Sequence, residues 1–560
     1  MAPSIKQRFA FVIATIITIT SFSQDSAVIQ VNYAKEIADM KPVWAWFGYD
    51  EPNYTYMKDG KKLLSELAAL SPVPVYVRAH NLLTTGDGTP ALKWGSTNAY
   101  TEDAQGNPVY NWTIVDSIFD TYIQRGMKPL AQIGFMPEAL SAHPKPYKHD
   151  WQPGQSYGKI FTGWSYPPAD YKKWATLVHE WVKHCVSRYG KKEVESWYWE
   201  LWNEPNGGYW HGNVKEYCQL YDYTSDAVKR ALPTARIGGP HVTGPSGSGS
   251  AQFLKTFLKH CISDTNAVNG TIGAPLDFIA FHAKGAPKLV DGHVRMGISN
   301  QLRDISNGFE IVASYKEWRH LPIVIGESDP EGCAACGMAT NPENAYRNGT
   351  MYSSYTAASF ARKYLLADHF SVNLLGAVSW SFEFEDQPWF YGFRDLATNG
   401  VDKPVLNVFR LFGMMAGKRV AVTSDHMYPL FSIRDSGVRK QTDIGAIAAK
   451  DAHTATAMIW NYHDDDITGE PATVILKCSG IPARQVTIKT YRIDAEHSNS
   501  YEVWKNMSSP QQPTAEQIAQ LEKAGQLEQV SNATAGTKNG LLQLNLKLPR
   551  QGIVFVKFEY

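Results

Sequence analysis

The sequence predicts an α/β protein in which a (β/α)8 TIM barrel is joined to an accessory antiparallel β-sandwich. Short apolar runs alternate with helix-like segments from residue 43 to about residue 380, which is typical of a parallel sheet. Eight of these runs read as strands, and a (β/α)8 barrel needs eight. After residue 420 the pattern changes to strand-like alternation of apolar and polar residues.

The barrel strands are expected at residues 43–47, 73–78, 128–134, 196–203, 236–240, 277–282, 322–327 and 374–380. Helical patterns lie between them, for example over residues 171–189 and 214–232. A doubly wound open sheet is the alternative for such a pattern, but no Gly-x-Gly-x-x-Gly motif follows an early strand. We therefore assign residues 25–410 to the barrel.

The C-terminal part, residues 411–560, is rich in strand-like segments. They are expected at residues 455–461, 473–478, 486–493, 541–548 and 553–558. Turn-rich stretches separate them, and a helical segment at residues 514–524 interrupts them. This pattern indicates a β-sandwich, to which residues 25–42 could add a strand.

The N-terminus has the pattern of a secretory signal. Lys6 and Arg8 precede an apolar run at residues 9–20, and small residues follow at 21–24. The run is shorter than the roughly 20 residues that a membrane-spanning helix needs, and no later segment is long and apolar enough. We therefore expect residues 1–24 to be a signal peptide and the protein to be secreted or periplasmic, without a membrane span.

Charge and cysteine content exclude several classes of function. Lysine plus arginine and aspartate plus glutamate both number 54, so the sequence gives no reason to expect a nucleic-acid partner. Aromatic residues make up 12%, which suits a carbohydrate cleft as well as a large core. Cys333-Ala-Ala-Cys336 has no second Cys-x-x-Cys motif beside it, so a local disulfide or two free thiols are favoured over a zinc or redox site.

The strongest chemical signal is the segment 199–206, which reads Trp-Glu-Leu-Trp-Asn-Glu-Pro-Asn. A strand ends here, and the turn places Asn203 and Glu204 at its carboxyl edge, where catalytic groups of a barrel gather. Cleavage of a glycosidic bond needs an acid to protonate the leaving oxygen, and a carboxylic acid with a raised pKa can supply the proton. Glu204 is therefore the candidate acid/base, and the amide of Asn203 is a candidate partner of the sugar 2-hydroxyl.

The second carboxylate is expected at the end of a later strand. Residues 321–326 form a buried run that ends in Glu327, and Asp329 follows it in the loop. We favour Glu327 as the nucleophile because it stands at the end of the strand. A retaining glycosidase would need the carboxyl groups of Glu204 and Glu327 to lie about 5–5.5 Å apart.

These motifs resemble glycoside hydrolase family 39, which contains β-xylosidases and α-L-iduronidases. The resemblance runs from about residue 43 to residue 420. It implies a barrel with a β-sandwich beside it and retention of configuration. The family's Asn-Glu-Pro on the fourth strand and Glu on the seventh match Asn203-Glu204-Pro205 and Glu327, with the roles of acid/base and nucleophile.

The resemblance also implies four further substrate-binding positions, three of them in other strand segments. His80 looks like a second-strand histidine that reaches a substrate hydroxyl, and His282 looks like a sixth-strand histidine beside the nucleophile. Trp380 resembles the eighth-strand ring that floors the first sugar site, although packing in the core is an equal reading of that residue. Arg394 lies in a stretch similar to the family's closing loop.

Two basic residues bear on the identity of the sugar. Lys284 and Arg394 are similar in place to residues that iduronidases direct at a substrate carboxylate, and Arg is well suited to bind one. The alternative is that they neutralise nearby acids such as Glu383, Glu385 and Asp386, in which case the sugar is neutral. Glu383-Phe384-Glu385 also resembles an acidic pair of the xylosidases, which makes Glu385 a candidate substrate-binding residue. We favour a β-xylosidase.

The sequence thus predicts an exo-glycosidase that removes non-reducing-end xylosyl residues from plant or algal cell-wall polysaccharides and their oligosaccharides. A uronic-acid-specific exo-glycosidase, an endo-acting barrel glycanase and a carbohydrate-binding protein without activity are the alternatives. No cofactor and no metal are expected, because His184, His241 and His260 lack the spacing of metal ligands. The oligomeric state cannot be read from the sequence.

Overall fold

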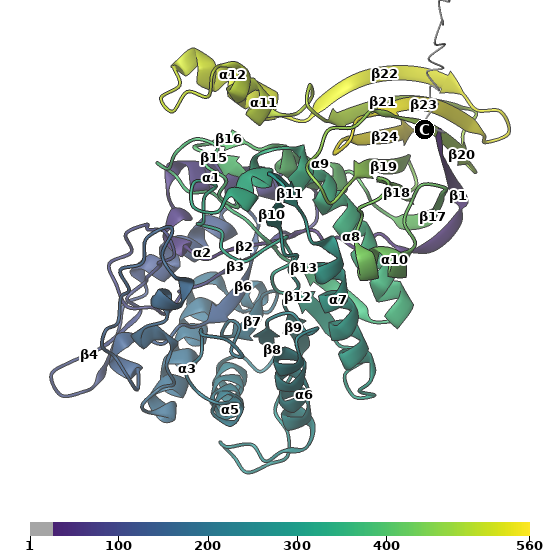
Figure 1. Cartoon of the computed structure of the whole chain (residues 1–560). Helices are drawn as coiled ribbons and strands as arrows, with labels where there is room; N and C mark the ends of the chain where they lie inside the picture. Colours follow the sequence, from purple (N-terminus) through teal and green to yellow (C-terminus); the bar gives the residue numbers. More distant parts are fainter. Residues whose placement is uncertain (1–25) are drawn as a thin grey trace, which may run out of the picture.

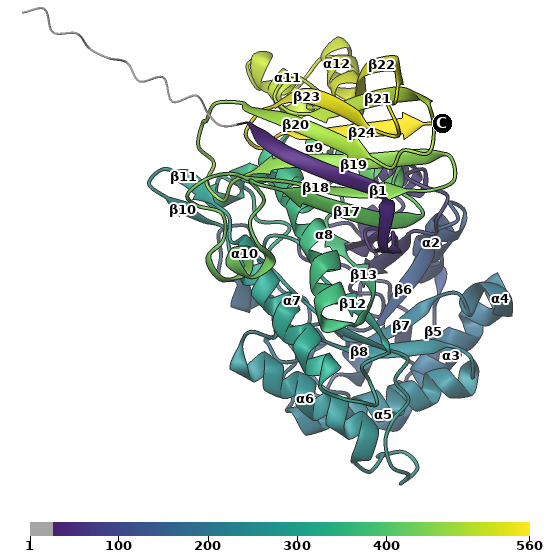
Figure 2. The ribbon, with the colours of Figure 1, turned by 90° about the vertical axis from the view of Figure 1, so that its right-hand side faces the viewer.

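The computed structural model describes residues 26–560, so the predicted signal peptide lies outside the described residues. Figure 1 shows two parts: a barrel in which strands alternate with helices, and a large curved sheet above it. Figure 2 shows the same arrangement from the side, with the N-terminal strand lying inside the upper sheet.

The barrel sheet has the strand order β13-β12-β9-β8-β7-β6-β3-β2-β14. Its strands are β2 (Trp46–Tyr49), β3 (Tyr76–Ala79), β6 (Lys128–Ile133), β7 (Tyr198–Leu201), β8 (Arg236–Val242), β9 (Phe278–Phe281), β12 (Pro322–Ile325), β13 (Asn373–Ala377) and β14 (Ser379–Trp380). The last two are consecutive pieces of one strand. Because β13 pairs with β12 and β14 pairs with β2, both in parallel, the sheet returns to its first strand. The predicted eight-stranded barrel is confirmed, and the open sheet is excluded.

One long helix follows each barrel strand. These helices are α1 (Lys58–Ala68), α2 (Thr113–Ile123), α3 (Tyr171–Tyr189), α5 (Val214–Ala231), α6 (Ser248–Ser263), α7 (Ile298–Ala313), α8 (Thr350–Phe370) and α9 (Pro404–Gly413). A short helix, α4 (Lys191–Val194), follows α3. The start of α5 is fixed by a capping box, in which Asn213 accepts from the backbone of Glu216 and Glu216 accepts from the backbone of Asn213.

Three of the loops between barrel strands and helices contain short β-hairpins. They are β4 (Tyr100–Glu102) with β5 (Pro108–Tyr110), β10 (Lys288–Val290) with β11 (His293–Arg295), and β15 (Ala397–Thr398) with β16 (Val401–Asp402).

Large side chains fill the interior of the barrel. Trp46, Tyr198, Phe278 and Val324 come from different strands and are buried in one cluster with Trp380. Such layers make a barrel interior a packed core rather than a channel. Space for a ligand is therefore expected at the carboxyl ends of the strands.

The accessory domain is one mixed sheet with the strand order β22-β21-β24-β19-β18-β17-β1-β20-β23. Its strands are β1 (Ala27–Asp39), β17 (Lys418–Ser424), β18 (Asp443–Lys450), β19 (Thr454–Tyr462), β20 (Ala472–Ser479), β21 (Gln485–Ile493), β22 (Glu528–Gly536), β23 (Leu542–Leu548) and β24 (Ile553–Glu559). All pairs are antiparallel except β1 with β20, so the sheet is mixed rather than wholly antiparallel as predicted. Three helices accompany it: α10 (Leu430–Ser436), α11 (Ser500–Asn506) and α12 (Ala515–Gly525).

A buried polar contact joins the barrel to the accessory sheet. Arg362 of α8 donates a 2.7 Å hydrogen bond to Asp443, which begins β18. Trp460 of β19 donates to the other oxygen of Asp443 at 2.8 Å, and its ring lies 5.1 Å below the Arg362 guanidinium. All three side chains are fully buried, so the charge of Arg362 is neutralised within the interface.

Within residues 26–560, no helix combines the length and the apolar character that crossing a bilayer requires.

Candidate active site

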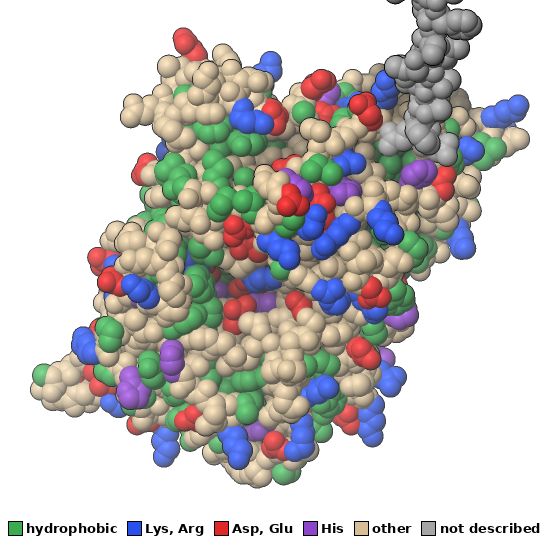
Figure 3. Space-filling view, in the orientation of Figure 1, with side chains coloured by type: hydrophobic (Ala, Val, Ile, Leu, Met, Phe, Trp, Pro, Cys, Tyr) green, Lys and Arg blue, Asp and Glu red, His purple; other side chains and the backbone are tan. Residues whose placement is uncertain are grey.

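The carboxyl ends of the barrel strands surround a cavity of about 600 Å³, a volume within the usual range for ligand sites. Glu204, His282, Lys284, Glu327 and Trp380, all expected from the sequence, line it. Figure 3 shows a hollow near the middle of one face of the molecule, with acidic, basic and histidine side chains exposed inside it. These five residues, which come from distant parts of the sequence, therefore lie together at the mouth of the barrel.

Glu204 and Glu327 approach each other closely across this cavity. One oxygen from each carboxylate and a ring nitrogen of His282 all lie within 4.8 Å of one another. Glu204 stands three residues beyond β7 with a φ of 43°, and its backbone N–H donates to the carbonyl of His241. Glu327 stands two residues beyond β12, and its carbonyl accepts from Ala283. Backbone contacts to the neighbouring strand ends thus hold both acids in place.

Basic side chains surround the carboxylate of Glu327. Arg78 Nη1 lies 3.2 Å and His80 Nε2 lies 3.4 Å from Oε1, while the Lys284 ammonium contacts Oε2. Burial by itself would raise the pKa of Glu327, but the positive charges of Lys284 and Arg78 reverse that effect. The pKa of Glu327 therefore lies well below its ordinary value, and the side chain is ionised.

Glu204 has the opposite electrostatic environment. Burial, and after it the negative charge of Glu327, raises the pKa of Glu204 to about 7. Its side chain is 18% exposed, compared with 6% for Glu327, so it is also the more accessible of the two. Two carboxyl groups whose pKa values are separated in this way can act as an acid and a nucleophile in the same site.

A chain of side chains connects Glu204 to the barrel interior. His241 Nε2 contacts Glu200 Oε2, His241 Nδ1 lies 3.3 Å from His282 Nε2, and His282 Nδ1 lies 2.9 Å from Glu204 Oε1. Burial lowers the pKa of both histidines, that of His241 to about 4, so both rings are neutral. Glu200 is ionised, because Arg78 and His241 outweigh the effect of its burial and lower its pKa.

The neutral rings fix the direction of every hydrogen bond in this chain. Among residues 26–560, neither Glu200 Oε2 nor His241 Nε2 has another hydrogen-bond partner, so we assign the hydrogen to His241 Nε2. His241 Nδ1 then accepts from His282 Nε2, which leaves His282 Nδ1 as an acceptor. His282 Nδ1, as an acceptor, can form a hydrogen bond with Glu204 only when Glu204 is protonated. This chain of hydrogen bonds therefore favours the protonated form of Glu204.

Arg78 organises the other side of the site. Its three nitrogens donate to Glu200 Oε1 at 2.6 Å, to Asn203 Oδ1 at 3.0 Å and to Glu327 Oε1 at 3.2 Å. Because the oxygen of the Asn203 amide is occupied by Arg78, its NH₂ group is left to donate. This orientation suits the predicted contact of Asn203 with a sugar hydroxyl.

Trp380 and Asp50 line the deep wall of the cavity, and His80 and Lys93 contact them from behind. The Trp380 indole donates to Asp50 Oδ1 at 3.1 Å, and its ring centroid lies 4.4 Å from that of His80. Lys93 pairs with the second oxygen of Asp50. Burial would raise the pKa of Asp50, but Lys93 and His80 lower it, so Asp50 presents a charged acceptor to the cavity.

Sequence reasoning missed Asp50, Glu200 and His241. Asp50 had a usable signal, since it directly follows β2, but the predicted strand ended at residue 47. Glu200 and His241 lie within β7 and β8, and their contact joins residues that are distant in the sequence. Only the arrangement of the barrel brings them together.

Four predicted substrate-binding residues, His80, Asn203, Arg394 and Glu385, are not among the side chains that line the cavity, and the last two have partners elsewhere. Arg394 is fully buried, where it pairs with Asp329 and donates to the Trp380 carbonyl at 2.6 Å. Glu385 accepts from the backbone N–H of Asp59 at 2.9 Å, at the start of α1. The expected contact of these two side chains with substrate is therefore corrected: Arg394 supports the strand that carries Trp380, and Glu385 caps a helix.

Glu204, His282 and Glu327 also have the spacing of a metal site. However, the carboxylate of Glu327 already faces Lys284 and Arg78, and these cations would repel a metal ion. The donor set fits proton transfer and nucleophilic attack better than metal binding.

Comparisons with known proteins agree with this geometry. Residues 27–539 match the family model described as glycosyl hydrolases family 39. A β-xylosidase of Geobacillus stearothermophilus is 26% identical over 86% of either chain, and one of Caldicellulosiruptor saccharolyticus is 24% identical over 95% of this chain and 98% of its own. The mouse α-L-iduronidase is 23% identical over 96% of this chain and 81% of its own. A monomeric β-xylosidase from Caulobacter crescentus shares the fold with a TM-score of 0.74, at 19% identity over 95% of this chain and 99% of its own.

Proposed function

The chain belongs to glycosyl hydrolases family 39 and is a glycoside hydrolase, and from this we propose that it is a retaining exo-β-xylosidase. Its substrates would be plant or algal cell-wall oligosaccharides and polysaccharides that end in xylose. Glu204 would serve as acid/base and Glu327 as nucleophile. Export, predicted from residues 1–24, would bring the enzyme to such polymers, and N-terminal sequencing of the mature protein would test it.

The observation that carries this proposal is the separation of the two carboxylates. Their oxygens approach within 4.8 Å. Retaining glycosidases hold their carboxyl groups about 5–5.5 Å apart, whereas inverting enzymes need about 6.5–9.5 Å to admit a water molecule. The spacing of Glu204 and Glu327 therefore supports direct attack on the sugar rather than attack by water.

The charges of the site support a double displacement. In the first step, a carboxylate oxygen of Glu327 attacks the anomeric carbon while Glu204 gives its proton to the leaving oxygen, which forms a glycosyl ester and frees the rest of the chain. In the second step, Glu204 takes a proton from water, and that water attacks the same carbon and releases Glu327. Two inversions retain the configuration of the sugar.

The paired charges around the cavity favour a neutral sugar over a uronic acid. A uronate carboxylate needs a free cation, yet Lys284 faces Glu327 and Asp329, and Lys93 faces Asp50. Lys284, which lines the cavity, and Lys93, which lies behind Asp50 and over the Tyr157 ring, are therefore both already paired with acids. This is why we place xylose ahead of iduronic acid, although relatives with both activities resemble the chain.

A substrate screen tests the proposal directly. The purified protein would be assayed on 4-nitrophenyl β-xyloside, α-L-arabinoside, β-glucuronide and an aryl α-L-iduronide. We expect the β-xyloside to have a kcat/KM at least about tenfold above the others, which corresponds to about 1.4 kcal/mol of discrimination. Faster release from the iduronide would instead assign the uronidase activity. Cleavage of long xylans only at internal bonds would contradict exo action.

The pH dependence of kcat/KM should reveal the acid form of Glu204. Glu204 must be protonated to act on the leaving oxygen, and its pKa is about 7, so the rate should fall roughly tenfold per unit above pH 7. Glu327 must be ionised, and because its pKa is lowered, the acidic limb should lie below the ordinary range of a glutamate. The measurement is a kcat/KM profile from pH 3 to 10 on a xylo-oligosaccharide.

A substrate that needs little acid assistance provides the control for this pH profile. With β-xylosyl fluoride, whose leaving group needs little protonation, the alkaline limb should flatten. An alkaline limb that is equally steep for both substrates would show that a group other than Glu204 controls it.

A further inference from the structure

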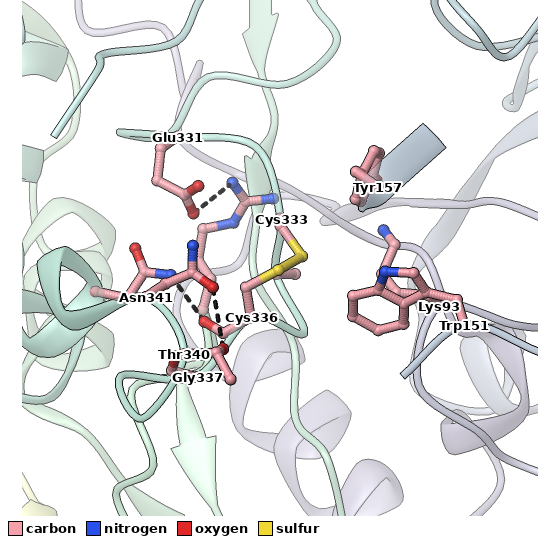
Figure 4. The surroundings of a disulfide bond; sticks show 12 residues. Lys93, Trp151, Tyr157, Glu331, Cys333, Cys336, Gly337, Thr340 and Asn341 are labelled. Carbon is pink, nitrogen blue, oxygen red and sulfur yellow. Dashed lines mark hydrogen bonds and ion pairs between the residues drawn. A yellow bond between two sulfur atoms is a disulfide. The ribbon is translucent and has the colours of Figure 1, made fainter. Parts of the chain in front are cut away.

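The mouth of the cavity lies between two loops that the proposed chemistry does not use. One loop, residues 332–341, follows β12 and contains a disulfide between Cys333 and Cys336, which settles the two readings of this pair in favour of the bond. The other loop, residues 151–157, follows β6. Figure 4 shows the disulfide on one side of the gap and Trp151 and Tyr157 on the other. Side chains of both loops line the cavity.

The two loops meet at one edge of the mouth. Gly154 lies so close to Thr340 that a Cβ atom built on it would be 3.2 Å from Thr340 Cγ2. The φ of Gly154 is 90°, a conformation that favours glycine. The mouth is thus bounded where the loops touch, and Trp151 and the disulfide both line the cavity beside this contact.

The backbone around the disulfide has its own support. The fully buried guanidinium of Arg347 donates to the carbonyls of Cys333 at 2.9 Å, Cys336 at 3.1 Å and Gly392 at 3.1 Å. Asn344 donates to the carbonyl of Cys336 at 2.7 Å. The loop is therefore held by a buried cation and an amide, while the disulfide itself lies at the cavity wall.

The chemistry of the mouth fits a sugar ring. Trp151 and Tyr157 provide aromatic surface on one wall, and the disulfide provides apolar, polarisable atoms on the other. Gln155 and Asn341 add amide groups that can bind hydroxyls. Because a pyranose has apolar C–H surfaces and a rim of hydroxyls, this combination matches a sugar better than a lipid or an anion.

We propose that these loops form the site for the sugar ring attached to the leaving oxygen, with the Cys333–Cys336 disulfide as a specificity-determining wall. This inference rests on the proposed exo action, in which the reacting sugar fills the floor beside Glu204 and Glu327 and the next ring stands at the mouth. The loops would therefore select substrates whose leaving group is itself a sugar, not a small group.

The test compares two substrates that share the reacting sugar and differ only in the leaving group. For each enzyme, kcat/KM would be measured on a disaccharide, such as xylobiose, and on the matching glycosyl fluoride, whose leaving group cannot reach the mouth. Trp151→Ala and the double variant Cys333→Ser/Cys336→Ser should each lose about tenfold on the disaccharide, mainly through KM. Both should stay within about twofold of wild type on the fluoride.

Two controls distinguish direct contact with the leaving sugar from a purely structural role of these residues. Trp112→Ala removes an indole that stacks on Tyr110 and His184 outside the cavity, and it should change neither substrate. Treating the wild type with a thiol reductant should reproduce the loss of the double variant on the disaccharide, and the double variant should not respond.

The outcomes distinguish this inference from the proposed function. Equal losses on both substrates, or an unchanged disaccharide rate in both variants, would overturn the site for the leaving sugar. A wild-type enzyme that cleaves no xyloside would instead overturn the proposed function, and it would do so before any variant is made. If the screen identifies another sugar, the same comparison is run with its disaccharide and fluoride.

Discussion

Replacing Glu327 by glutamine is expected to lower kcat/KM by about 10⁴-fold or more, whatever the leaving group. The loss should be this large because the carboxylate forms the bond to the anomeric carbon, and an amide cannot replace it. Lys284 and Arg78 hold Glu327 ionised and in position, so the wild-type group is ready to attack. The measurement is steady-state turnover of an aryl glycoside with an activated leaving group.

Covalent trapping shows whether Glu327→Gln loses activity because the nucleophile is absent or because the site is disturbed. A 2-deoxy-2-fluoro glycoside with an activated leaving group should label the wild-type enzyme on a peptide that contains Glu327, because the fluorine slows hydrolysis of the ester. Glu331→Gln is the matched control, since this acid lies in the same loop and pairs with Arg347 rather than with the reacting carboxylate. It should still be labelled. Labelling of Glu327→Gln at any other acid, such as Asp329, would contradict the assignment.

The sequence predicted the positions of the two acids because both depend on a local rule. A buried apolar run that ends in a polar residue places that residue at the mouth of a barrel, whatever the rest of the chain does. Glu204 and Glu327 satisfy this rule, and so does Asp50, which was missed only because the first strand, β2, ends two residues later than predicted.

The contacts between strands had no local signal. Glu200 and His241 sit inside strands whose apolar neighbours predict burial, but nothing in either segment indicates that the two side chains face each other. Arg394 and Glu385 show a different limit of sequence-based prediction, which concerns the direction of side chains in loops. The resemblance placed them in the right loop, yet the direction of a side chain in an irregular loop depends on what packs around it, here Asp329 and the start of α1.

The accessory sheet was predicted only in part. β20 alternates buried residues with exposed or half-buried ones, and β23 alternates half-buried with exposed residues. In contrast, β22 is polar and mostly exposed along its length, and β18 is buried on both faces and built largely from small residues. Neither pattern has the period of two that identifies a half-buried strand, so both strands escaped prediction.

Replacing Glu204 by alanine should give a loss that depends on the leaving group. A sugar leaving group needs the proton of Glu204, so kcat/KM on a xylo-oligosaccharide should fall about 10²–10⁴-fold. A dinitrophenyl leaving group departs without help, so its first step should be nearly unaffected, and the glycosyl ester should accumulate because no base activates water. Steady-state turnover and the initial burst of dinitrophenol measure the two steps separately.

Added azide should then restore turnover in Glu204→Ala, because azide needs no base and the removed side chain leaves room for it beside the ester. The product should be the β-glycosyl azide, since attack on the ester inverts the carbon a second time. Glu385→Ala is the control: its carboxylate caps α1 away from the cavity, so it should keep its activity and lose about 1 kcal/mol of stability at most. An α-azide product, or no rescue of Glu204→Ala by azide, would show that Glu204 does not face the leaving group. It would also mean that the hydrogen-bond chain through His282 and His241 holds a proton for some other purpose.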